Sequence, residues 1–187
     1  MVNTTLRLFI AVEAPEEVIQ EARYLQTRFA DEHLFEGSFT QPAGLHITLI
    51  FLGAVNTHKL DDLKQRLQSV SARQLSARLN GLDLFMNNGN HVIFIRVESP
   101  ALHDLVAAIT QELGTEFRSE EREFVGHITL ARIKKINEQA REQLLYEISA
   151  LHTKPIEFVI TSFVLKQSEL TPNGSIYTDL AHYQLRT

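Results

Sequence analysis

The tetrapeptide His46-Ile47-Thr48-Leu49 occurs a second time in the chain as His127-Ile128-Thr129-Leu130. Each copy lies in a short apolar run bounded by residues that break regular structure, which is typical of a buried strand. Alternate side chains of a strand point to opposite faces. Each copy therefore predicts a strand with its histidine and threonine on one face and its two apolar residues on the other.

A repeated tetrapeptide alone says little, because chance produces one in about a tenth of chains of this length. A single His-x-Thr can also be an ordinary polar pair that is hydrogen-bonded inside a strand. The strand-like flanks of both copies favour a functional interpretation of the two together. Imidazole takes or gives a proton near neutrality. Two histidines and two threonines around one cleft therefore predict general acid–base chemistry, with one histidine in each role.

The composition limits the classes of protein to consider. With 187 residues, 44% of them hydrophobic, the chain is expected to form one domain, or two closely joined lobes, around a real core. Its net charge of −5 argues against a broad basic surface for long nucleic acids, whereas a few cations can still hold a nucleotide or an RNA end. The chain has no cysteine, which excludes disulfides, thiolate nucleophiles and cysteine-bound metals.

The N-terminal apolar run over residues 6–12 contains Arg7 and is too short for a signal peptide or a membrane span. We therefore expect a cytoplasmic protein without a membrane partner. The rest of the chain has the patterns of strands and helices of ordinary length.

Strand and helix patterns are mixed along the chain. Expected strands cover residues 6–12, the two His-x-Thr segments, a hairpin of 79–86 and 91–97 around Asn87-Asn88-Gly89-Asn90, and a closing pair of 156–166 and 175–185 around Thr171-Pro172-Asn173-Gly174. Expected helices cover residues 15–31, 56–72, 100–117 and 137–151, and a loop covers 33–44. This order predicts an α+β fold with antiparallel sheet and two related halves.

Four stretches of the chain appear together in one known family, in the same order and spacing. They are Arg7-Leu8-Phe9-Ile10-Ala11, residues 45–53 with the first His-x-Thr, residues 127–132 with the second, and residues 168–178. In these stretches the chain resembles the 2H phosphoesterases, specifically the RNA 2′,3′-cyclic phosphodiesterases, also called LigT-like 2′-5′ RNA ligases. Two positions depart from the family pattern. Gly126 stands where a proline usually precedes the second histidine, and Phe39 is the nearest aromatic residue where the family often has a tryptophan.

The resemblance implies a fold and an activity. The expected fold is α+β and bilobal, with two antiparallel sheets that form a central cleft and with helices outside. Residues 1–187 would form a single 2H phosphoesterase domain made of two pseudo-symmetric lobes. The expected reaction is hydrolysis of RNA 2′,3′-cyclic phosphodiester ends to 2′-phosphomonoesters by metal-independent two-histidine catalysis. Formation of 2′-5′ linkages is expected as a reversible side activity.

The resemblance also assigns roles to residues. It makes His46 the proton donor and His127 the proton acceptor, an order that nothing in the sequence itself decides. Thr48 and Thr129 are expected to donate hydrogen bonds to the substrate phosphate. Strict alternation places Arg132 on the face opposite His127, but a strand end or a twist brings it back, and the family pattern has an arginine at the site. A guanidinium suits a phosphate because it binds with two parallel hydrogen bonds.

Aromatic residues are expected to hold the base or ribose. Phe9 and Tyr177 are the candidates, because aromatic stacking binds a nucleobase without sequence preference. Packing in the core or at the rim explains both residues equally well.

Two other functions compete with this interpretation. A metal hydrolase would need metal-ligand spacing such as His-Glu-x-x-His, which the chain lacks, so we expect neither a metal nor another cofactor. A non-catalytic module that binds a nucleotide such as AMP is the second alternative, but a pure binder has no need of two proton-transfer groups. The expected partners are RNA ends or nucleotides with a 2′,3′-cyclic phosphate, and the protein is expected to be a monomer.

Overall fold

The computed structural model describes residues 4–87, 90–117, 123–171 and 174–187. The central residues of both predicted turns, 88–89 and 172–173, lie outside the described residues. The strands are β1 (Thr5–Glu13), β2 (Glu36–Phe39), β3 (His46–Asn56), β4 (Leu75–Asn87), β5 (Asn90–Glu98), β6 (His127–Lys135), β7 (Glu157–Ile160), β8 (Ser162–Thr171) and β9 (Gly174–Gln184). The helices are α1 (Glu16–Asp31), α2 (Leu60–Gln68), α3 (Pro100–Leu113) and α4 (Glu138–Ala150), with short 3₁₀ turns at Pro42–Gly44 and Thr57–Lys59.

The strands form two antiparallel groups that meet at one point. Their order is β7-β4-β5-β6-β3-β1-β8-β9, and β2 pairs with the free side of β6. The junction between β6 and β3 consists of a single residue pair, Ile47 with Ile128. We call β2, β4, β5, β6 and β7 the His127 lobe, and β1, β3, β8 and β9 the His46 lobe. The predicted α+β fold is confirmed, and its two sheets are continuous through that one pair.

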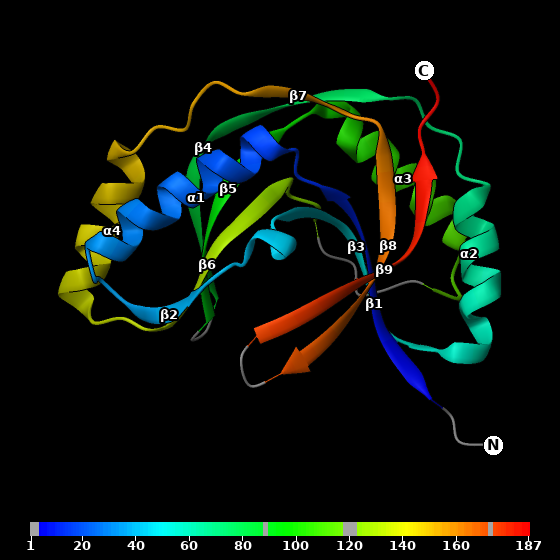
Figure 1. The fold of residues 1–187 in the computed structure, drawn as a ribbon, viewed down its shortest axis with the longest axis horizontal. Helices are drawn as coiled ribbons and strands as arrows, with labels where there is room; N and C mark the ends of the chain where they lie inside the picture. The colour runs from blue at the N-terminus through cyan, green and yellow to red at the C-terminus, as the bar shows by residue number, and fades with distance from the viewer. Residues whose placement is uncertain (1–3, 88–89, 118–122, 172–173) are drawn as a thin grey trace.

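The helices lie at the two ends of this curled sheet. Figure 1 shows α1 and α4 beside the His127 lobe and α2 at the opposite end of the molecule. Helix α1 begins after Pro15 and carries Glu16 and Glu17 in its first turn, where acidic side chains favour the helix dipole. Its buried face, which includes Leu25 and Phe29, joins the core shared by both lobes. No helix in the described parts of the chain is long and apolar enough to cross a membrane.

Two boundaries differ from the sequence prediction. The expected strand 156–166 divides at Thr161, so that β7 pairs with β4 in the His127 lobe while β8 pairs with β1 and β9 in the His46 lobe. A continuous apolar pattern cannot reveal that a chain changes sheets. The expected loop 33–44 contains β2, a short strand with exposed residues that lacks the apolar alternation of a buried strand.

Candidate active site

The two repeated motifs open the two central strands, β3 and β6. His46, Thr48, His127 and Thr129 are each half-buried. The alternate residues are fully buried: Ile47, Leu49, Ile128 and Leu130. The predicted division of faces is therefore confirmed for both copies. Because β3 and β6 run antiparallel, the Ile47–Ile128 pair places His46 toward Thr129 and His127 toward Thr48. The two histidines therefore lie diagonally across the junction on one face, close enough for the charge of His127 to act on His46.

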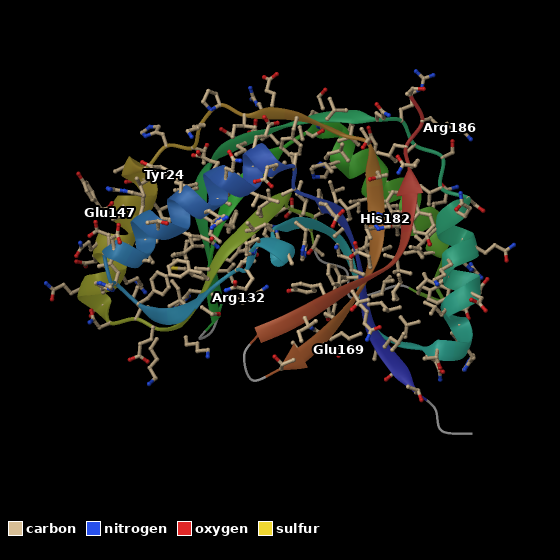
Figure 2. All side chains as sticks on the ribbon, viewed as in Figure 1. Tyr24, Arg132, Glu147, Glu169, His182 and Arg186 are labelled. Carbon is tan, nitrogen blue, oxygen red and sulfur yellow. The ribbon has the colours of Figure 1, made fainter. Side chains whose placement is uncertain are left out.

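A β-bulge on β6 decides where Arg132 points. Thr129 and Ala131 pair with consecutive residues of β5, so Leu130 is an extra residue without a partner on that strand. One extra residue reverses the alternation of all that follow. Arg132 is consequently exposed on the face of His127, and not on the opposite face that strict alternation predicts. In Figure 2, Arg132 lies on the side of β6 that faces the β8–β9 hairpin.

Donors from two other segments hold the bulge in place. The carbonyl oxygen of Leu130 accepts hydrogen bonds from Gln26 Nε2 at 2.9 Å and from the backbone N–H of Thr40 at 2.9 Å. Gln26 Nε2 also donates to the Thr40 carbonyl at 2.8 Å. Helix α1 and the segment before β3 therefore fix the backbone that presents Arg132.

His127 is surrounded by aromatic rings and one backbone carbonyl. Its ring lies 5.1 Å from the ring of Phe85 and 5.2 Å from that of Phe94, and these two phenylalanines stack on each other at 4.0 Å. Its Nδ1 lies 2.7 Å from the Val125 carbonyl oxygen. Burial lowers the pKa of His127, the bond to Val125 opposes this change, and the charge of Arg132 lowers the pKa further.

Gly126 leads into this strand where the family usually has proline. A Cβ at this position would lie 2.5 Å from the Val97 carbonyl oxygen, so a side chain does not fit without movement of the backbone. The Gly126 carbonyl in turn accepts the Val97 N–H at 2.8 Å. In this chain, glycine is thus required by the close approach of β5. Phe39, near the usual place of the tryptophan, packs on Phe35 with 5.7 Å between ring centroids.

His46 has a second aromatic environment. Its ring lies 5.0 Å from Phe9 and 5.2 Å from Tyr177, and its Nδ1 is buried without a hydrogen-bond partner among the described residues. The pKa of His46 is lowered from 6.5 to about 4, above all by burial and then by the charge of Lys166. His127 and Arg132 lower it further, and Asp179 opposes them.

The two predicted base platforms differ in exposure. Phe9 is only 3% exposed, and His46 and Tyr177 cover its ring. Little of its face is left for a nucleobase. Tyr177 is half-buried and retains accessible surface. The role of either ring toward a base stays a prediction.

The polar groups expected to bind phosphate have no hydrogen-bond or ion-pair partner among the described residues. Across residues 4–87, 90–117, 123–171 and 174–187, neither the Thr48 nor the Thr129 hydroxyl makes a hydrogen bond, and Arg132 forms no ion pair. The charge of Arg132 nevertheless reaches both imidazoles, because it lowers the pKa of each. Two neutral imidazoles, two hydroxyls and one guanidinium thus lie on one face of the joined strands β3 and β6, and the hydroxyls and the guanidinium have no partner among the described residues. Such a set can transfer protons and bind an anion.

The sequence profile of the 2′-5′ RNA ligase superfamily matches residues 11–171. The chain belongs to this superfamily. Among curated members, an RNA 2′,3′-cyclic phosphodiesterase of Thermus thermophilus is 33% identical, and the match covers 97% of this chain and 91% of the relative. One of Methanocaldococcus jannaschii is 30% identical over 92% of this chain and 96% of its own.

The superfamily assignment agrees with the three-dimensional structure. The crystal structure of TT0787 from Thermus thermophilus superposes with a TM-score of 0.77 at 29% identity, over 97% of this chain and 98% of the other. The bilobal 2H phosphoesterase arrangement is therefore the fold of this superfamily member.

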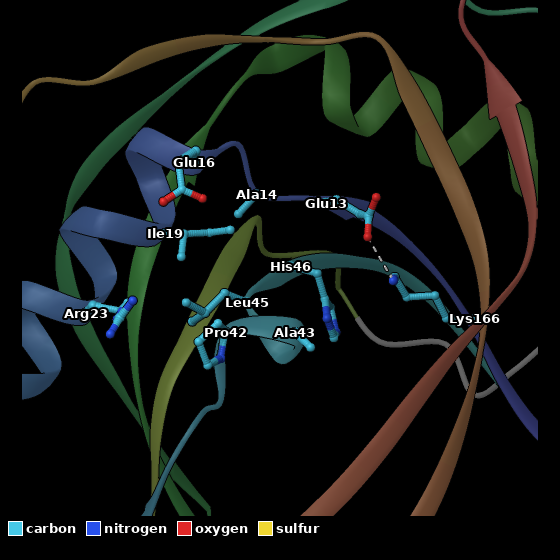
Figure 3. A pocket seen from close by; sticks show the side chains of 10 residues that line it. All are labelled: Glu13, Ala14, Glu16, Ile19, Arg23, Pro42, Ala43, Leu45, His46 and Lys166. Carbon is cyan, nitrogen blue, oxygen red and sulfur yellow. Dashed lines mark hydrogen bonds and ion pairs between the residues drawn. The ribbon is translucent and has the colours of Figure 1, made fainter.

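Sequence reasoning missed a buried lysine beside His46. Lys166 is 4% exposed, and its Nζ pairs with Glu13 Oε1 at 3.1 Å and with Asp179 Oδ1. Lys166, Glu13 and His46 line a pocket of about 390 Å³ (Figure 3). A lysine directly after the apolar run 163–165 of an expected strand was the available signal, because lysine is almost never fully buried unless it is paired.

The same cluster contains the one group of three possible metal ligands found among the described residues. Ligand atoms of Glu13, Asp179 and His182 lie within 4.8 Å of one another, and all three residues are exposed. The ammonium of Lys166 already contacts both carboxylates. A cation of the protein itself therefore occupies the place where a metal would be held, and neither His46 nor His127 belongs to the group.

Proposed function

We propose that the protein hydrolyses 2′,3′-cyclic phosphodiesters at RNA ends to 2′-phosphomonoesters. The observation that carries this proposal is the convergence of His46, His127, the two threonine hydroxyls and Arg132 on one face of two joined strands. The curated relatives named RNA 2′,3′-cyclic phosphodiesterase support the same activity. Residues 1–187 act as one domain of two lobes, in which each lobe contributes one histidine and one threonine.

His127 is suited to be the base. When its imidazole is neutral, Nδ1 must carry the proton in order to donate it to the Val125 carbonyl at 2.7 Å. Nε2 is then the atom with a free lone pair. The lowered pKa of His127 keeps the ring neutral near pH 7, so it is ready to accept a proton from water.

His46 is suited to be the acid only when substrate is bound. With a pKa of about 4 in the free cleft, its imidazole is neutral near pH 7. An anionic phosphate beside the ring raises the pKa, because a nearby negative charge favours the protonated form. Protonation of His46 is thereby coupled to binding of the phosphate.

The reaction balances with these groups alone. The oxygen of a water molecule attacks phosphorus while His127 Nε2 takes its proton. The bond between phosphorus and O3′ breaks, and His46 gives its proton to O3′, which leaves a 2′-phosphate and a 3′-hydroxyl. Thr48, Thr129 and Arg132 donate hydrogen bonds to the phosphoryl oxygens, where negative charge develops. A 5′-hydroxyl in place of water would form a 2′-5′ linkage by the same steps.

The test is incubation of a 2′,3′-cyclic-phosphate oligonucleotide with the wild type in excess EDTA. The expected product carries a 2′-phosphate, and His46→Ala and His127→Ala each lower turnover by about 10²–10⁴-fold. His58→Ala is the matched control, because His58 is exposed on the 3₁₀ turn Thr57–Lys59 outside the cleft. Near-wild-type turnover in both cleft variants would refute the mechanism. Activity lost in EDTA and restored by a metal would favour a metal hydrolase. Tight AMP binding without any turnover would favour the binding module.

A further inference from the structure

Strand β3 carries the same irregularity as β6. Thr48 and Ile50 pair with consecutive residues of β1, so Leu49 is an extra residue on β3. The bulge follows the threonine of the motif in both strands, and it has the same effect on the residues beyond it. Phe51, five positions after His46, therefore faces the cleft as Arg132 does, five positions after His127.

The two lobes thus place different side chains at equivalent positions. The His127 lobe presents Arg132 there, and the His46 lobe presents Phe51, a residue that is 40% exposed. An arginine from the neighbouring strand covers this ring. The Cζ atom of Arg7, on β1, lies 4.5 Å from the centroid of Phe51, which is a favourable cation–π distance. The cleft consequently has one guanidinium on each side.

Arg7 is held in place yet keeps most of its donors free. Its Nη1 donates to Ser168 Oγ at 3.2 Å, and Ser168 is a buried residue of β8. A guanidinium has five N–H donors. Arg7 is exposed, and no carboxylate in the described part of the chain pairs with it. Phe51 and Ser168 fix the orientation of the guanidinium without neutralising its charge.

The position of Arg7 separates it from the reacting phosphate. In the pairing of β1 with β3, His46 lies opposite Glu13, whereas Arg7 lies opposite Ala54, toward the other end of both strands. Ser168 pairs across β8 and β9 with Tyr177, whose ring contacts His46. Arg7 thus contacts the strand partner of Tyr177, while His46 contacts the Tyr177 ring itself. An anion at Arg7 would therefore be separated from a phosphate at His46 along the direction of β1 and β3.

We propose that Arg7, supported by Phe51 and Ser168, binds a second phosphate of the substrate, the phosphodiester that joins the terminal nucleoside to the rest of the RNA. This inference rests on the proposed function and names the form of substrate preferred. The planar fork of a guanidinium matches two phosphate oxygens. The protein accordingly favours an oligonucleotide end over a free nucleoside 2′,3′-cyclic phosphate, which has no such phosphodiester.

The test compares kcat/KM for two substrates with the same terminal base, a dinucleotide and a mononucleoside 2′,3′-cyclic phosphate. In Arg7→Gln the ratio of the two values is expected to fall about tenfold relative to the wild type, the usual worth of a charged hydrogen bond. Phe51→Ala, which removes the supporting ring, is expected to lower the ratio less. Arg141→Gln is the matched control, since Arg141 is exposed on α4, and it should keep the wild-type ratio.

A dinucleotide with an uncharged methylphosphonate linkage isolates the phosphodiester. The kcat/KM of the wild type should fall on this substrate by the same factor by which Arg7→Gln lowers kcat/KM on the natural dinucleotide. For Arg7→Gln, the two linkages should give similar values of kcat/KM. Equal losses on the dinucleotide and the mononucleoside, or no loss on either, would overturn the proposal for Arg7. Affinity for a dinucleotide with a 2′-phosphate, measured by calorimetry, gives the same comparison without turnover. If the wild type cleaves neither substrate, the proposed function fails and the calorimetry still decides the role of Arg7.

Discussion

The depressed pKa of His46 predicts that the folded protein loses stability in mild acid. The folded state holds this imidazole at a pKa of about 4, against 6.5 in the unfolded chain. Between these values the unfolded chain binds a proton that the folded protein does not. The free energy of unfolding therefore falls as the pH drops from 6.5 toward 4 and levels off below that range.

The size of this loss follows from the two pKa values. Between about pH 7.5 and about pH 5, the difference in proton binding at His46 alone corresponds to about 2 kcal/mol. That is a large share of the roughly 5–15 kcal/mol by which single domains are stable. His127 adds to this loss of stability in acid, because its pKa is also lowered in the folded state. The main cause of that lowered pKa is again burial.

The assay is urea unfolding of the wild type and His46→Gln at both pH values. The wild type should lose about 2 kcal/mol more than the variant over this range, because glutamine does not titrate. All other titrating groups are shared by the two proteins and cancel in the comparison. His127→Gln measures the second histidine separately. If the wild type and His46→Gln lost the same stability, His46 would not be desolvated in the folded state, and the reasoning on its protonation would fail.

Three further predictions concern single residues. Lys166→Met removes a cation that depresses the pKa of His46, so NMR titration of the imidazole should show that pKa rising toward 6.5. Arg132→Gln should raise KM for a cyclic phosphate about tenfold and shift the acid limb of the pH–rate profile upward, because its charge lowers the pKa of both histidines. An unchanged limb would contradict the placement of Arg132. Phe29→Ala should lower the free energy of unfolding by about 3–5 kcal/mol without changing KM, because Phe29 is 1% exposed in the core and outside the site.

The sequence predicted those features that depend on local pattern. Periodicity and turn residues located the two His-x-Thr strands, the hairpin of β4 and β5, and the four main helices within a few residues. Helix α3 ends earlier than expected, at Leu113, because Gly114 adopts a positive φ of 60° at its end. Alternation alone also decided correctly which side of each motif is buried.

Features that depend on pairing between strands could not be predicted. The bulge that turns Arg132 toward His127 exists only in the register of β6 against β5. The cluster around Lys166 draws residues from β1, β8 and β9, which become neighbours through a sheet order that differs from the chain order. No spacing along the sequence joins Glu13 to Asp179, and only the folded sheet does so.

The unpaired Leu130 also affects how related chains can be aligned and redesigned. A related chain with one residue fewer between the positions of His127 and Arg132 could still be aligned so that both the histidine and the arginine match. In the folded strand, this deletion would remove the bulge and turn the arginine side chain toward the hydrophobic core. Substitution of Leu130 by another apolar residue leaves the number of residues between His127 and Arg132 unchanged, so the bulge and the orientation of Arg132 are kept. The number of residues in this segment thus constrains the active site more strictly than their identity.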